Sequence, residues 1–293
     1  EAAAVVDRTL GLPHNDPQAV AVAGDKRRSR EQWAASGVAC PGFEWRSWDD
    51  PGRNEPPGFG FPAVVKPLAL SAGRGVIRVD DRDALAAAVA RVEAIVSAEQ
   101  ECRGQSGFLV ERFVSGPEVA VEGLLRGGVL EILAVFDKPG ALDGPYFEET
   151  IYLTPSRLSD SVQSSLARTA AAACAAIGLT EGAVHIELRI ADAGPVVIEA
   201  NPRAIGGLCS DVLRFGTGLT LEEILLHHAL GQRAPVPERA EGAAGVMMLP
   251  VTSGGKLLRV DGVQAAEAVM GIERVAITAH PGQRLDSWPE GGP

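Results

Sequence analysis

Two alternating segments decide the fold of this 293-residue chain, Ala183-Val184-His185-Ile186-Glu187-Leu188-Arg189-Ile190 and Val196-Val197-Ile198-Glu199-Ala200-Asn201. Because successive side chains of a strand point to opposite faces, each segment has an apolar face and a polar face. The loop between them, Asp192-Ala193-Gly194, places glycine where a tight hairpin turn needs a positive φ. The sequence therefore predicts an antiparallel hairpin whose polar side chains gather on one side.

The polar face of this hairpin brings two carboxylates together. A turn centred on Ala193 pairs Glu187 with Glu199, because both lie six residues from it. The Cβ atoms of such a pair are roughly 4.5–5.5 Å apart, and like charges there are destabilising. The same alternation predicts that Val197 and Asn201 share the face of Glu199. Two carboxylates and a carboxamide at one spot need a cation, and their hard oxygen atoms suit Mg²⁺ or Mn²⁺.

An exposed polar face of an edge hairpin is the alternative explanation, and for Glu187 alone it fits equally well. The residues after Glu199 favour the cation site, because Asn201 and Arg203 continue at two-residue steps. Pro202 ends the strand and fixes the turn that carries Arg203.

A second group of candidate residues follows an apolar strand that ends at Lys66. It is Leu70-Ser71-Ala72-Gly73-Arg74-Gly75, whose glycines let backbone N–H groups approach phosphate oxygens while the lysine supplies charge. The segment is not a Walker A loop, because no Gly-Lys-Ser/Thr occurs and no helix follows at once. An ordinary hairpin turn is an equal alternative for this segment alone. The G-x-G-x-x-A match at residues 58–63 is rejected as a dinucleotide motif, since no strand precedes it and no helix follows it.

The composition is that of a globular protein and argues against several classes of function. Apolar residues make up 46% and charged residues 22% of the chain. The net charge of -11 argues against nucleic-acid or membrane-surface binding, because no basic excess exists to hold phosphates. The four cysteines lack any C-x-x-C spacing, which is typical of a reducing compartment. We therefore expect a cytoplasmic enzyme with no nucleic-acid or membrane partner.

Strands and helices are mixed along the chain, which predicts an α+β (α/β) fold with largely antiparallel pairs. A helix is expected over 17–37, a loop rich in Pro and Gly over 51–62, and a long helix over 160–177. Residues 245–280 are expected to form a small β-rich region. The chain begins at Glu1 rather than Met and ends without a closing element, so we expect a fragment of a longer protein.

Taken together, these motifs resemble the ATP-grasp superfamily, and within it the carboxylate–amine ligases that include L-amino acid (dipeptide) ligases. The resemblance runs from about residue 25 to residue 231, and its motifs occur in the order and spacing of the family. They are Lys26; Pro62-Ala63-Val64-Val65-Lys66-Pro67; Ser71-Ala72-Gly73-Arg74-Gly75; Val110-Glu111-Arg112-Phe113-Val114-Ser115-Gly116-Pro117-Glu118; and Glu187 with Glu199-Ala200-Asn201-Pro202-Arg203. The implied fold is the ATP-grasp fold, in which two α+β subdomains clasp ATP.

The resemblance implies how ATP and its metal are held. The residues implied for ATP are Lys26, Lys66, Ser71, Gly73 and Gly75 at the phosphates, Glu111, Phe113 and Val114 at the adenine, and Glu118 at the ribose. Those implied for Mg²⁺ or Mn²⁺ are Glu187, Glu199 and Asn201, with Arg203 stabilising the transferred phosphoryl group. Surface positions remain alternatives for Glu111 and Glu118, and a helix-surface position remains one for Lys26, which precedes Arg27 and Arg28.

The substrate side is the less specific part of the resemblance. Lys138 is assigned to the γ-phosphate or a substrate carboxylate, and Glu148 or Glu149 to a substrate ammonium group. Gly206 and Gly207 let the backbone approach the substrate. A polar surface loop is an equal alternative for each of the three charged residues.

The implied reaction is ATP-dependent ligation of a small-molecule carboxylate to an amine through an acyl phosphate, with release of ADP and phosphate. An ATP-grasp carboxylase or purine-pathway ligase is one alternative, and a non-catalytic ATP-binding module is another. A homodimer is left open. We expect four segments: 1–60 as a remnant of an N-terminal domain with a linker helix, 61–114 as the small lid subdomain, 115–235 as the large catalytic subdomain, and 236–293 as a truncated β-rich region.

Overall fold

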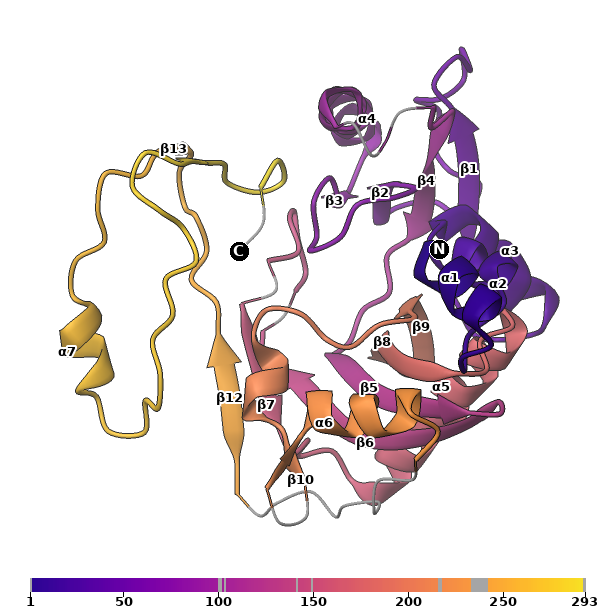
Figure 1. Ribbon diagram of the computed structural model, residues 1–293. Helices are drawn as coiled ribbons and strands as arrows, with labels where there is room; N and C mark the ends of the chain where they lie inside the picture. The colour runs from indigo at the N-terminus through magenta and orange to yellow at the C-terminus, as the bar shows by residue number, and fades with distance from the viewer. Residues whose placement is uncertain are drawn as a thin grey trace.

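Two antiparallel sheets form the frame of the molecule (Figure 1). The computed structural model describes residues 2–99, 102, 104–140, 142–148, 150–215, 218–232 and 242–291. The smaller sheet has, in spatial order, β1 (Phe43–Ser47), β4 (Gly107–Arg112), β2 (Ala63–Pro67) and β3 (Ile77–Val79). The larger sheet has β12 (Ala244–Met247), β7 (Ile151–Thr154), β6 (Val129–Lys138), β5 (Glu118–Arg126), β8 (Gly182–Ala191) and β9 (Gly194–Asn201). Helices pack on antiparallel strands in both parts, which confirms the expected α+β class.

The smaller sheet is covered by α4 (Arg82–Ala98). The helix begins after Asp81, whose carboxylate accepts a hydrogen bond from the backbone N–H of Ala84 at 2.8 Å. Its buried side chains recur at helical spacing, so one stripe of the helix faces the strands. They include Leu85, Val89, Val92 and Val96. This sheet contains β1, which lies within the predicted segment 1–60; the segment boundaries themselves stay predictions.

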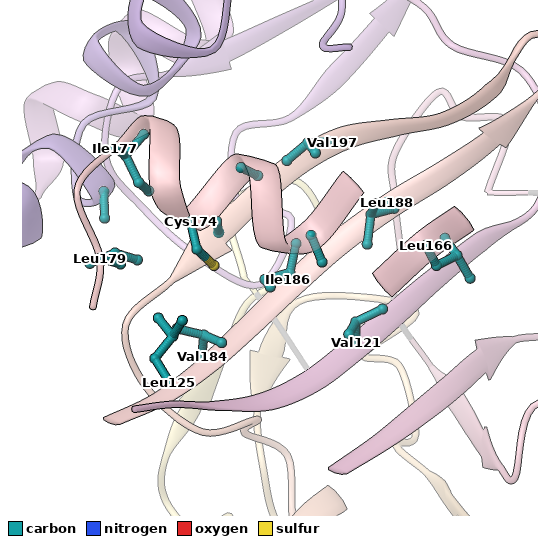
Figure 2. Close-up of a cluster of buried hydrophobic side chains, with 14 of the residues drawn as sticks. Val121, Leu125, Leu166, Cys174, Ile177, Leu179, Val184, Ile186, Leu188 and Val197 are labelled. Carbon is teal, nitrogen blue, oxygen red and sulfur yellow. The ribbon is translucent and has the colours of Figure 1, made fainter. Parts of the chain in front are cut away.

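The larger sheet packs one face against α5 (Asp160–Ala176). Figure 2 shows side chains of this helix meeting those of β5, β8 and β9 in one buried cluster. The helix is rich in alanine, which lets its backbone approach the sheet closely. Leu166 and Cys174 are fully buried in the contact, with Ile186 and Leu188 of β8 beneath them.

The opposite face of the larger sheet carries a second core beside the polar residues of the hairpin. It is covered by the chain after β9, by the 3-10 helix η2 (Cys209–Val212), and by α6 (Leu221–Ala229). The helix α6 begins with a reciprocal cap, in which Thr220 and Glu223 each accept from the other's backbone N–H. Short strands β10 (Arg214–Phe215) and β11 (Leu219–Thr220) pair between η2 and α6.

The prediction of one helix over 17–37 is wrong, because this segment forms two helices. They are α2 (Pro17–Ala23) and α3 (Lys26–Ala35), which follow α1 (Ala2–Leu10). The chain breaks at Gly24, and Asp25 starts the second helix by accepting from the N–H groups of Arg27 and Arg28 at 2.9 and 3.2 Å. The break matters because it puts Lys26 at the first position of α3.

The C-terminal part of the chain is less regular than the expected β-rich region. Of residues 248–283 only β13 (Gly255–Lys256) is strand, and α7 (Val263–Glu267) is a short helix. Strands need partners, and β12 finds one in β7, whereas the later segment is largely exposed: Met270 is 98% accessible. After β14 (Arg284–Leu285), Trp288 is buried against the segment after β2, where its Nε1 donates to the carbonyl of Ala72 at 3.2 Å. None of the described helices combines the length and apolar character of a membrane span.

Candidate functional site

The predicted hairpin is present, and Glu187 lies opposite Glu199 as expected. The predicted turn centred on Ala193 is wrong, because Ala191 pairs with Gly194 and the turn is the two residues Asp192 and Ala193. The expectation that Val197 shares the face of Glu199 is wrong. The register shifts by one residue, so Val197 pairs with Leu188 and is buried in the core that faces α5. The cause is a β-bulge, in which one extra residue, Ile198, reverses the alternation along the strand.

The polar face of β8 is an interior surface rather than an exposed edge. His185 and Arg189 are each only 3% exposed. The side chains of Glu187 and Glu199 are 12% and 23% accessible, so both carboxylates still reach solvent. Asn201 pairs with His185, and each lies two residues along its strand from one of the two glutamates. The hairpin therefore presents its acids inside a largely enclosed site.

A histidine bridges two carboxylates beside the hairpin. His185 Nε2 lies 3.2 Å from Glu187 Oε1, and its Nδ1 contacts the carboxylate of Glu122 on β5. Burial disfavours the charged imidazole, but the two glutamates outweigh it and raise the pKa of His185 to about 10. Glu122 is fixed in turn by the backbone N–H of Ile205, at 3.0 Å. His185 is therefore a buried cation that orients Glu187.

Lys138 occupies the centre of the site. It ends β6 next to Glu118, and its Nζ lies 2.8 Å from Glu118 Oε1 and 3.2 Å from Glu187 Oε1. Burial opposes ionisation of Glu187, yet Lys138 and His185 hold the pKa of that carboxyl well below its usual range. Arg189 Nε contacts the other oxygen of Glu118 at 2.9 Å. The surface-loop alternative for Lys138 and the surface alternative for Glu118 are both wrong, since both side chains are buried.

Glu111 is buried between two cations. Its Oε2 lies 2.8 Å from Lys66 Nζ, and its Oε1 lies 2.8 Å from Arg30 Nε. Burial alone would raise the pKa of this carboxyl, but Arg30 and Lys66 outweigh it and lower the pKa to about 2. Glu111 is therefore not the surface acid that the sequence left open.

We expect Glu111→Gln to lower the free energy of unfolding by about 3 kcal/mol at pH 7, because it leaves two buried cations without a counter-charge. The folded pKa is depressed, so this stabilisation is present above about pH 4.5 and is lost as pH falls toward 2. Urea unfolding from pH 7 to pH 3 measures it, and the gap between the two proteins should narrow below pH 4.5.

Glu93→Gln is the control for this prediction, because Glu93 also meets an arginine at 2.9 Å but is 38% exposed. It should cost no more than about 1 kcal/mol at any pH. Equal losses in the two variants would show that Glu111 has no special stabilising role.

Lys26 connects the glycine-containing segment to the hairpin. Its Nζ donates to the carbonyl of Leu70 at 2.8 Å and lies 3.5 Å from Glu199 Oε1. Only 8% of Lys26 is exposed, so the helix-surface alternative is wrong. The structure thus brings Lys26 and Lys138 to the acids of the hairpin, whereas Lys66 is paired with Glu111.

The segment 71–75 needs its glycines for conformation and for close contact. Gly73 and Gly75 have φ of +70° and +69°. A Cβ on Gly73 would lie 2.6 Å from the carbonyl oxygen of Phe147. In this structure the N–H of Gly75 donates to the carbonyl of Pro289 at 2.9 Å, and Ser71 is exposed.

Arg203 follows the hairpin and is exposed, with Nη1 bound to the carbonyl of Ala204 at 2.9 Å. It lines a cavity of about 340 Å³ together with Asn201 and Gly24. A second cavity, of about 560 Å³, opens beside Glu118 and Lys138.

The remaining predicted residues have these positions. Gly206 and Gly207 are exposed, and a Cβ on Gly207 would lie 2.5 Å from Met248 Sδ. The guanidinium groups of Arg78 and Arg189 lie over the ring of Phe113, at 4.4 and 5.2 Å from its centroid, and Val114 offers its carbonyl to Arg189 at 2.9 Å. Glu148 is exposed, and Glu149 lies outside the described residues.

The donor set of the hairpin fits a hard divalent cation. Across the described part of the chain, no group of three or more His, Cys, Asp or Glu side chains is arranged to hold a metal ion. The pair Glu187 and Glu199 with the amide of Asn201 offers only two carboxylates. That suits Mg²⁺, which takes one or two protein carboxylates and completes its shell with water and substrate phosphates.

Besides His185, the sequence prediction gave no role to three charged residues of this site, which are Glu122, Arg189 and Arg30. Glu122 and Arg189 lie on the polar faces of their strands, so alternation was an available signal for both. Arg30 follows Lys26-Arg27-Arg28-Ser29, a run that is typical of a solvated helix surface. Only the fold shows that Arg30 is 1% exposed.

Residues 59–212 match the model of the ATP-grasp domain, which is more than half of the chain. The chain belongs to the ATP-grasp family. The expected ATP-grasp fold is confirmed by the crystal structure of an L-amino acid ligase from Bacillus licheniformis, which is 28% identical with a TM-score of 0.81 over 98% of this chain and 70% of that chain.

Two relatives with similar sequences show how much of a longer protein this chain matches. An uncharacterized protein of Sinorhizobium fredii is 29% identical over 278 residues, which cover 94% of this chain and 56% of the relative. Carnosine synthase 1 of Gallus gallus is 35% identical over 225 residues, which cover 73% of this chain and 23% of the relative. The chain therefore spans about half the length, or less, of these relatives.

Proposed function

We propose that the protein is an ATP-dependent carboxylate–amine ligase that forms an amide or peptide bond on amino-acid substrates in the cytoplasm. The observation that carries the proposal is the pairing of Glu187 with Glu199 inside a site that also holds Lys26 and Lys138. The similarity to an L-amino acid ligase and to carnosine synthase supports amino acids as the substrate class.

The nucleotide is assigned to residues contributed by both sheets. Lys26 and Lys66 neutralise the phosphates, and the positive-φ glycines at 73 and 75 let the backbone of the loop approach them. Glu118 receives the ribose hydroxyls after exchanging part of its contact with Lys138. Glu111 fixes the ammonium group of Lys66 through an ion pair at 2.8 Å. The segment 62–113 acts as a lid that excludes water.

Glu187 and Glu199 would hold Mg²⁺ through their carboxylate oxygens, with Asn201 adding a carboxamide oxygen. When bound, Mg²⁺ with ATP supplies an electrophilic γ-phosphorus whose negative charge is partly neutralised. The substrate carboxylate oxygen bonds to that phosphorus as ADP leaves, and the amine then bonds to the acyl carbon as phosphate leaves with loss of one amine proton. Arg203 and Lys138 stabilise the charge on the transferred phosphoryl group, and no protein nucleophile is required.

We expect ADP release to require a pair of amino acids, one as carboxylate and one as amine, when Mg²⁺ and ATP are present. A coupled ADP assay across L-amino acids, singly and in pairs, measures this, and mass spectrometry identifies the product. Bicarbonate and nucleotide precursors are the comparison substrates.

ADP release that depends on bicarbonate or on a nucleotide precursor would refute the amino-acid proposal in favour of a carboxylase or purine-pathway ligase. ATP binding without ADP release under every condition would indicate a non-catalytic module.

A further inference from the structure

The strand β9 contains one residue more than the segment of β8 with which it pairs. Up to Val197 the pairing follows one register, with Val197 opposite Leu188; beyond it Glu199 lies opposite Glu187. Ile198 is therefore the extra residue of the bulge. In an unshifted strand Ile198 would face Glu187, and Glu199 would face Ile186.

That one-residue difference decides where the carboxylate of Glu199 points. Ile186 is fully buried in the core under α5, together with Val197. A slip of one residue moves a side chain to the other face of a sheet. Without the bulge Glu199 would point toward this apolar core and away from Glu187, so the pair of carboxylates exists only because Ile198 is accommodated.

The carbonyl of Ile198 is held by a buried guanidinium group. Arg30 Nη2 donates to the Ile198 oxygen at 2.6 Å, and Arg30 is 1% exposed. The strand β9 is the edge of its sheet, so its outer backbone groups have no strand partner. The backbone after α3 also contacts this edge, because Val197 N–H donates to the carbonyl of Ala39 at 2.9 Å.

The same guanidinium group reaches the smaller sheet. Arg30 Nε lies 2.8 Å from Glu111 Oε1 on β4, and Glu111 in turn lies 2.8 Å from Lys66 on β2. Glu111 is thus the buried counter-charge of the guanidinium group that meets Ile198. Arg30 of α3 therefore contacts the bulge beside Glu199 directly and is connected through Glu111 to Lys66 of the smaller sheet.

We propose that Arg30 is a positioning residue, which stabilises the bulge at Ile198 and thereby places Glu199 opposite Glu187 to bind the metal. The proposal rests on the proposed function only in taking Glu187 and Glu199 as metal ligands. Arg30 touches neither nucleotide nor substrate, and it acts through the backbone of β9.

The test is Arg30→Met, which keeps an unbranched apolar stem but removes the donors. Binding of Mn²⁺ with the non-hydrolysable analogue AMP-PNP is measured by electron paramagnetic resonance, which needs no turnover. We expect Mn²⁺ affinity to fall about tenfold or more, with Arg30→Lys intermediate. Leu166→Ala is the matched control, since Leu166 is fully buried under α5 and its loss destabilises the fold without touching Ile198.

A second variant separates positioning from general destabilisation. Deleting Ile198 removes the bulge and makes Glu199 the residue that directly follows Val197. Because Val197 pairs with Leu188, the continuous register then places Glu199 opposite Glu187 without a bulge. In this background Arg30→Met should cause no further loss of Mn²⁺ affinity. An equal loss with and without Ile198 would overturn the proposal.

A crystal structure of Arg30→Met gives a direct readout. Loss of the Glu187–Glu199 pairing supports the proposal, and retention of the bulge and of the pairing overturns it whatever the Mn²⁺ result. A wild-type chain that binds Mn²⁺ with AMP-PNP but releases no ADP contradicts only the proposed function. A wild-type chain that does not bind Mn²⁺ contradicts the metal assignment and this proposal with it.

Discussion

Arg203→Ala is expected to lower the rate of ADP formation by about 10²- to 10³-fold while ATP affinity changes little. The guanidinium group of Arg203 is exposed and its contact is with the neighbouring carbonyl of Ala204, so it stabilises no buried network. Its proposed contribution arises as charge develops on the transferred phosphoryl group. Steady-state kinetics for turnover and calorimetry with AMP-PNP for binding separate the two effects.

Two comparison variants sharpen this prediction. Arg203→Lys keeps the charge but loses the planar fork, and should recover only part of the rate. Arg214→Ala removes another exposed arginine that binds backbone carbonyls, and should leave turnover unchanged. Wild-type turnover in Arg203→Ala, or a loss of ATP affinity that accounts for the whole effect, would remove Arg203 from its catalytic role.

Glu199→Gln is expected to reduce turnover about 100-fold and to raise the Mg²⁺ concentration needed for half-maximal rate, because it removes a charged metal ligand. Its stability should change little, since its side chain is 23% accessible and its cation, Lys26, lies 3.5 Å away. Glu187→Gln should lose activity and also stability, because Glu187 faces Lys138 and His185 at 3.2 Å in a buried setting. Titration of the rate with Mg²⁺ and urea unfolding measure both variants.

The control for these substitutions is Glu31→Gln, which changes an exposed acid on α3 that pairs with Arg27 at 2.8 Å. It should leave the Mg²⁺ requirement unchanged. It should change the free energy of unfolding by no more than about 0.5 kcal/mol. If Glu199→Gln shows the Mg²⁺ dependence of the wild type, Glu199 is not a metal ligand.

The hairpin was predictable because its information is local. The alternation of β8 and a tight turn before the next strand follow from sequence spacing, and the structure confirms the hairpin and the opposition of Glu187 to Glu199. The turn itself is Asp192-Ala193, so that opposition arises from the bulge at Ile198 and not from the turn centre that the spacing predicted. The position of Val197 was not predictable in this way. A bulge leaves the strand's composition unchanged, so Ile198 carries no mark of being the extra residue.

The burial of charged side chains was the property least predictable from the sequence. Lys26, Glu111 and Glu118 each fitted an exposed position, because charged side chains are rarely buried without partners. Their partners come from distant parts of the chain: Leu70 for Lys26, Arg30 and Lys66 for Glu111, and Lys138 and Arg189 for Glu118. No local pattern shows such pairings.

The sequence by itself determined the two carboxylates, their hairpin, the glycine segment after Lys66, and through their order the ATP-grasp fold. These depend on strand periodicity and turn chemistry, which act over a few residues. Only the tertiary structure decided that Arg30 and Ile198, 168 residues apart, meet at 2.6 Å and that a bulge turns Glu199 toward Glu187. A contact of that kind forms when α3 packs against the edge of the sheet, and it is invisible until the chain is folded.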